Sequence, residues 1–119
     1  SAAKKAKLMA DSGIIRNRLK IDSAVSNAKA YLAVLEKHDS FASYIWNFVE
    51  HRPIQNCFKT LADVPASTGL SDLMAKTLKK DGFKFVGSTI CYAYMQATGM
   101  VNDHLADCHR HEVCRQLGL

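Results

Sequence analysis

The stretch that decides the fold spans residues 78–108 and reads LKKDGFKFVGSTICYAYMQATGMVNDHLADC. Apolar residues recur in it at intervals of four, three, four and three, which predicts that they share one face of a helix. The positions between them are also largely apolar, which is typical of a helix that is buried on most sides. We therefore expect a central helix, ended by a glycine, against which the rest of the chain packs. The predicted face comprises Val86, Ile90, Ala93, Ala97 and Met100, and the predicted end is Gly99.

Length and composition indicate an all-α protein with one core. A chain of 119 residues with 48% hydrophobic content can form one domain. Two prolines and six glycines argue against a turn-rich all-β fold and against disorder. The absence of an 18-residue apolar run and of a signal peptide predicts a cytoplasmic protein with no membrane partner. Helices are predicted over residues 2–10, from about 16 or 18 to 37, from Ser40 to Pro53, and from Ser67 or Ser71 to Gly82.

A basic segment lies near the start of the chain. Six of the first twenty residues are Lys or Arg and one, Asp11, is acidic, within a formal net charge of +5. This pattern indicates an anionic partner, although a solvated helix face would look the same. Gly13 can take a positive φ, and the N–H groups that follow it begin a helix, where phosphate binds readily. A lone glycine between two helices is otherwise an ordinary turn.

Histidine and cysteine residues gather toward the C-terminus. His104 and Cys108 lie four positions apart in a predicted helical run from about Asn102, a spacing that suits two ligands of one Zn²⁺ but also an unliganded surface pair. Residues 109–119 predict a solvated, mobile tail, whose HRHEVC segment could alternatively complete a metal site. The four cysteines lack a CxxC pair, so we expect them to be reduced, with Cys91 in the core.

Several motifs resemble the C-terminal half of the bacterial DNA-3-methyladenine glycosylase I family. They include GFKFVG at 82–87, TICY at 89–92, MQA at 95–97 and VNDH at 101–104. The resemblance continues upstream to the GIIR segment at 13–16 and covers about residues 10–108.

The resemblance implies a helical DNA glycosylase fold with a helix-hairpin-helix element at about residues 8–32. It implies hydrolysis of the N-glycosidic bond of 3-methyladenine in alkylated duplex DNA, after base flipping and without a redox cofactor. The hairpin would hold the DNA backbone without reading its sequence. Its DNA-binding residues would be Gly13, Ile14, Ile15, Arg16, Arg18 and Lys20.

The resemblance also implies what this chain lacks. Members of the family hold a structural zinc through a histidine and a cysteine at the positions of His104 and Cys108, with two more ligands near the N-terminus that do not occur here. The acid and most of the aromatic side chains of the base pocket also belong to that preceding part. We therefore expect no catalytic residue in this chain, a domain at residues 1–108 that is incomplete at its start, and an inactive fragment.

Two readings of the function remain open. The chain is either part of a DNA glycosylase or a non-catalytic helix-hairpin-helix module that binds DNA. In the first case the central helix would expose an apolar patch and favour self-association. Trp46 could stack on a base, but a lone Trp in an amphipathic helix is more often a packing residue.

Overall fold

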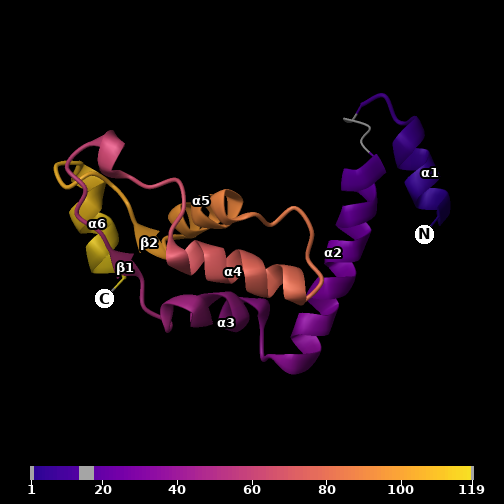
Figure 1. The fold of residues 1–119 in the computed structure, drawn as a ribbon, viewed down its shortest axis with the longest axis horizontal. Coiled ribbons are helices and arrows are strands. Elements are labelled where there is room, and N and C mark those ends of the chain that lie inside the picture. Colours follow the sequence, from indigo (N-terminus) through magenta and orange to yellow (C-terminus); the bar gives the residue numbers. More distant parts are fainter. Residues whose placement is uncertain (1, 14–17, 119) are drawn as a thin grey trace.

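The fold is mostly helical, as predicted, in a computed structural model that describes residues 2–13 and 18–118 (Figure 1). The helices are α1 (Ala2–Ala10), α2 (Arg18–Lys37), α3 (Phe41–Trp46), α4 (Gly69–Lys80), α5 (Ser88–Thr98) and α6 (His109–Leu117). Two short strands, β1 (Ile54–Gln55) and β2 (Val101–Asn102), pair in parallel, with Ile54 opposite Val101.

The core lies between α3, α4 and α5, and the largest helix contact is between α4 and α5. Met74, Tyr92, Met95 and Met100 are at most 2% exposed. Burying side chains of this size is the main stabilising contribution, at roughly 1.5–3 kcal/mol each. The core residues are Val34, Tyr44, Ile45, Val49, Met74, Ala75, Leu78, Cys91, Tyr92, Met95, Met100 and Val101.

The central helix is present, but it is not buried on most sides as predicted, because Ile90 and Tyr94 on its outward side are exposed. Helix α5 ends at Gly99, which has a φ of 79°, as its position in the sequence indicated. Its buried residues are Cys91, Tyr92 and Met95, whereas Ile90 is 59% exposed. Because α5 is apolar nearly all round, spacing alone cannot tell which of its faces meets α4.

The helix ends follow local capping chemistry. Ser40 caps α3 as predicted, because its Oγ accepts a hydrogen bond from the Ser43 N–H at 3.0 Å. The cap of α4 is Thr68 and not Ser67 or Ser71. Ser71 is instead the reciprocal partner, since its Oγ accepts a hydrogen bond from the Thr68 N–H at 2.8 Å.

Helix α3 ends earlier than the sequence predicted. The α-helix ends at Trp46, and a 3-10 turn over Asn47–Val49 follows it. Glu50 and His51 then take positive φ values of 53° and 61°, which reverse the chain before Pro53 is reached. A residue in the left-handed region commonly ends a helix in this way.

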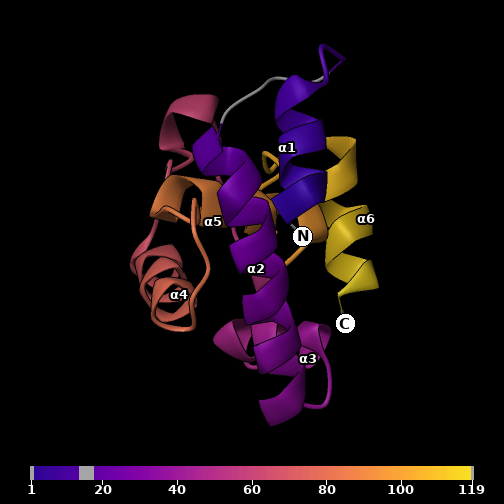
Figure 2. The ribbon, with the colours of Figure 1, turned by 90° about the vertical axis from the view of Figure 1, so that its right-hand side faces the viewer.

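Helices α1 and α2 form an arm that extends from the core (Figures 1 and 2). The radius of gyration is 17.3 Å, whereas a compact chain of this length has about 14 Å. Helix α1 has no buried residue and lies beside the upper part of α2. The lower part of α2 contacts α3. The arm therefore presents most of its surface to solvent.

The C-terminal region differs from both predictions made for it. His104 lies in a bend after β2 and not in a helix, and Cys108 precedes α6. The predicted solvated tail is instead helix α6, in which His111 is 9% exposed. His111 Nε2 lies 2.6 Å from the Asn56 carbonyl oxygen, and Asn102 Nδ2 donates to the His111 carbonyl at 2.8 Å. A count of polar residues could not reveal these two tertiary contacts.

Among the residues that the structure describes, no helix is long and apolar enough to cross a membrane.

Candidate nucleic-acid interface

The arm carries the basic side chains predicted to meet phosphate. Arg18 and Lys20 are exposed in the first turn of α2. Lys5 forms an ion pair with Asp22 at 3.2 Å, which links α1 to α2. Three of the predicted residues, Ile14, Ile15 and Arg16, lie outside the described residues.

Gly13 is exposed, but its φ is not positive. Its N–H donates to Asp11 Oδ1 at 2.8 Å. A Cβ at Gly13 would lie 3.1 Å from that same oxygen. The exposed Asp11 side chain could move slightly to admit a Cβ, so neither this contact nor a positive φ requires glycine at the position.

A second helix pair, α4 and α5, also joins through a turn with glycines and lysines. Gly82 has a φ of 100° after the last turn of α4, and Gly87 caps α5 without a side-chain hydrogen bond. Because glycine has no side chain, Gly87 offers no acceptor to the first N–H groups of α5, which favours an anion nearby. Lys79, Lys80 and Lys84 are exposed around this turn. In the sequence, Gly82, Lys84 and Gly87 belong to the GFKFVG motif of the family resemblance, but no phosphate-binding role was predicted for them.

The turn between α4 and α5 is anchored to α2 by a single side chain. Asn27 Oδ1 accepts a hydrogen bond from the Lys84 N–H at 2.7 Å, and Asn27 Nδ2 donates to the Lys84 carbonyl at 3.1 Å. Further along, Ser88 Oγ donates to Asp72 Oδ1 at 2.5 Å. The turn therefore lies beside the arm, as Figure 1 shows, and runs back toward the start of α4.

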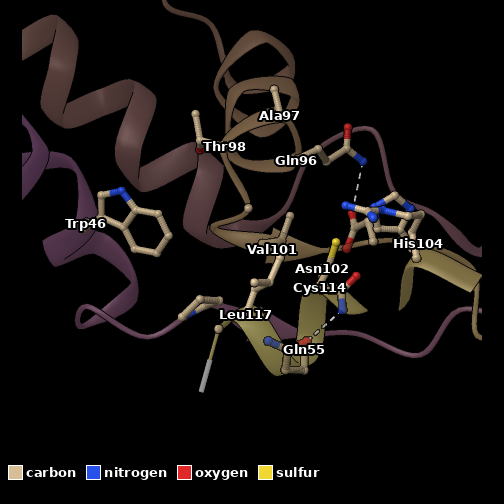
Figure 3. A pocket seen from close by; sticks show the side chains of 15 residues that line it. Trp46, Gln55, Gln96, Ala97, Thr98, Val101, Asn102, His104, Cys114 and Leu117 are labelled. Carbon is tan, nitrogen blue, oxygen red and sulfur yellow. Dashed lines mark hydrogen bonds between the residues drawn. The ribbon is translucent and has the colours of Figure 1, made fainter. Parts of the chain in front are cut away.

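A pocket of about 590 Å³ lies between the end of α5, the two strands and α6 (Figure 3). Trp46 and His104 lie on opposite sides of it. Trp46 is partly buried and packs against the core, so its structural interpretation is confirmed although it also borders the pocket.

The acid that lines this pocket, Asp103, is held by three donors. Asn56 Nδ2 donates to Oδ1 at 2.7 Å, while Tyr92 Oη at 2.5 Å and Gln96 Nε2 at 3.0 Å donate to Oδ2. Burial raises the pKa of Tyr92, and its hydrogen bond to Asp103 raises it further. The Asp103 carboxylate therefore has a structural role, because both of its oxygens accept hydrogen bonds from other parts of the chain.

The candidate metal ligands lie close together. His104 Nδ1 and Cys108 Sγ are 4.0 Å apart, near the roughly 3.6 Å that separates nitrogen and sulfur on one tetrahedral zinc ion. Within residues 2–13 and 18–118, no group of three His, Cys, Asp or Glu side chains could hold a metal ion. The structure therefore brings the two predicted ligands together, but it shows no third ligand from α6 beside them among the described residues.

The outward face of α5 is apolar and exposed, as expected. Ile90 is 59% and Tyr94 41% exposed, with Ala93 and Ala97 exposed beside them. All four cysteines are free thiols, and Cys91 is buried with its Sγ 3.4 Å from the Val86 carbonyl. Burial raises the pKa of the Cys91 thiol, consistent with an inert core residue.

The chain is similar in sequence and in fold to known DNA glycosylases. A model of the methyladenine glycosylase family matches residues 1–111. DNA-3-methyladenine glycosylase 1 of Escherichia coli strain K12 is 49% identical over 102 residues, which cover 86% of this chain and 54% of that protein. A crystal structure of 3-methyladenine DNA glycosylase I, 47% identical, superposes with a TM-score of 0.85 over 93% of this chain and 61% of that one.

A second solved structure, of a 3-methyladenine DNA glycosylase I variant in complex with 3-methyladenine, is 27% identical with a TM-score of 0.86. It covers 93% of this chain and 60% of that one. The fold is therefore that of a helical DNA glycosylase. The chain belongs to the methyladenine glycosylase family. It spans about half the length of the curated relatives that it matches.

The hydrogen bonds to Asp103 generate a stability prediction. Asp103→Ala should lower the free energy of unfolding by about 3 kcal/mol, because Tyr92 and two amides lose an ionised acceptor. Urea denaturation measures the change. Asp107→Ala, at an exposed position nearby, is the matched control and should change stability by less than about 0.5 kcal/mol. Equal stability of the two variants would contradict the structural task assigned to Asp103.

Proposed function

We propose that this chain is the DNA-holding part of a DNA-3-methyladenine glycosylase, which hydrolyses the N-glycosidic bond of 3-methyladenine in alkylated duplex DNA. The observation that carries the proposal is the shared fold, at 47% identity over 93% of the chain, with a 3-methyladenine DNA glycosylase I. Methylation at N3 makes the base cationic, so that it leaves as a neutral group. Such an enzyme must flip the nucleotide and bind the cationic base by aromatic stacking and a carboxylate.

The residues of this chain would bind and support rather than cleave. Asp103, the acid that lines the pocket, already accepts three hydrogen bonds. It is therefore a poor candidate for a general acid or a base-binding carboxylate. The alternative function, a non-catalytic DNA-binding module, rests on the same surfaces and differs only in chemistry.

Release of free base from methylated DNA tests the proposal. We expect no 3-methyladenine above background from the 119-residue chain, and release when the N-terminal segment of the Escherichia coli relative precedes Ser1. Chromatography of the released bases measures both, with the intact relative as the positive control. If the extended chain binds duplex DNA but releases nothing, the non-catalytic module is the better account.

We propose that the basic turns hold the DNA backbone, with a helix-hairpin-helix element as their structural basis. The turn between α1 and α2 is supported by the exposed Arg18 and Lys20. For the turn between α4 and α5, the support is the close packing of the two helices and the Gly87 cap, which offers no side-chain acceptor to the start of α5. Both would act on phosphates without reading bases.

Salt dependence of duplex binding separates the two turns. Arg16→Ala combined with Arg18→Ala should weaken binding about equally for all sequences and reduce the slope of log K against log salt by about 2, since each phosphate contact contributes about 0.9. Fluorescence anisotropy measures this. Lys84→Ala examines the other turn, and Lys37→Ala, at the far end of α2, is the charge-matched control. Unchanged affinity in the double variant would remove the α1–α2 turn from the interface.

We propose that His104 and Cys108 supply two of the four ligands of a structural zinc ion. Their 4.0 Å separation supports this, and the remaining ligands would come from outside the described residues. The zinc would stabilise the fold and take no part in the reaction.

Metal content tests the zinc assignment in the extended chain. His104→Ala and Cys108→Ala should each lose about one equivalent of zinc and lower Tm, while base release per folded molecule is retained. Cys114→Ala is the control, because it removes a thiol nearby. Full zinc content in the His104→Ala, Cys108→Ala double variant would reject these ligands.

We also propose that the isolated chain self-associates through the apolar face of α5. Ile90→Lys should shift the sedimentation coefficient to that of a 13.2 kDa monomer, because a charge would oppose burial of this face. Leu117→Lys, which changes another exposed apolar residue, should not. A monomeric parent chain would contradict the proposal.

We infer a cytoplasmic location, supported by four free thiols and by the bacterial relatives. Recovery in the membrane or periplasmic fraction of cells would argue against it.

A further inference from the structure

Phe85 combines backbone strain with exposure. Its φ is 59°, a left-handed value that is a genuine outlier for a bulky residue. Among residues 2–13 and 18–118, the other positive-φ residues with side chains are Glu50 and His51, which end the 3-10 turn after α3, where this conformation has a local purpose. Phe85 lies five residues after the end of α4 and three before the start of α5, so it is not the cap of either helix.

The residues on both sides of Phe85 are anchored. The Asn27 amide holds the N–H and the carbonyl of Lys84 at 2.7 and 3.1 Å. Val86 packs against the core, and its carbonyl lies 3.4 Å from Cys91 Sγ. The chain around Phe85 is therefore held firmly enough to maintain a strained residue, as is common at functional sites.

The Phe85 side chain gains little from this arrangement within the chain. It is 53% exposed, whereas Phe83, two residues earlier, packs against the core and lies 6.1 Å from the Phe41 ring. The structure thus keeps one aromatic ring of the turn in the core and directs the other toward solvent.

The surroundings of Phe85 carry positive charge. Lys79, Lys80 and Lys84 are exposed around the same turn. An apolar partner protein would have to cover these ammonium groups, whereas a nucleic acid offers phosphates to them and bases to the ring. Aromatic side chains interleaved with lysines are a general means of holding unpaired bases.

We propose that Phe85 stacks on a base that has lost its partner in DNA bound at the α4–α5 turn. This inference rests on the proposed function, since it requires DNA at that turn. It adds to the proposed contacts with the DNA phosphates, because stacking on an unpaired base would make the chain bind distorted DNA more tightly than fully paired DNA. The strained backbone is what presents the ring to the DNA.

Two readouts on the 119-residue chain test the inference. The first is the affinity ratio between a 20-base-pair duplex with one abasic-site analogue and the same duplex fully paired. Phe85→Gly should reduce this ratio at least fivefold, with affinity for the paired duplex nearly unchanged, and Phe85→Tyr should keep it. The second is Tm, which Phe85→Gly should raise by a few degrees because glycine accepts this φ.

The outcomes separate this inference from the proposed function. An unchanged ratio in Phe85→Gly, or a Tm that falls because the ring is needed for packing, would overturn the stacking role while DNA binding stands. A parent chain that binds neither duplex would overturn both. Leu73→Ala, which removes another apolar side chain that is 53% exposed, is the control and should change neither readout.

Discussion

The carboxylate of Asp103 is the constraint on which the C-terminal half of this structure depends. Its donors come from the segment after β1 and from two turns of α5, so one acceptor joins three parts of the chain. Strands of two residues are too short to persist alone. The pocket wall and His104, which follows Asp103 directly, owe their placement to this set of hydrogen bonds.

A second constraint operates at the other end of the molecule. Asn27 bonds both backbone groups of Lys84 and so fixes the α4–α5 turn against the middle of α2. The arm and this turn therefore present their basic residues in a fixed relation. In the proposed function this relation would favour binding of a stiff duplex at two points, because less conformational freedom would be lost on binding.

The candidate site could be predicted only in part. The charge pattern predicted a basic segment in the arm, and the spacing of His104 and Cys108 predicted that they lie close together. The segment expected to hold that pair is, however, irregular and not a helix. The role proposed for the α4–α5 turn was not predicted, because its lysines and glycines also serve as ordinary helix-ending signals. Phe85 was missed because no sequence pattern reports a positive φ at a bulky residue.

Local chemistry along the chain was sufficient for the all-helical class, for the start of α3 at Ser40 and for the end of α5 at Gly99, because caps and left-handed glycines act over one turn. The tertiary structure decided which face of α5 is buried. It also decided that α6 packs against the chain through His111. The residues of α5 are apolar on most of its circumference, and Asn56, which contacts His111, lies far away in sequence. Only the packed chain decides between alternatives that are locally equivalent.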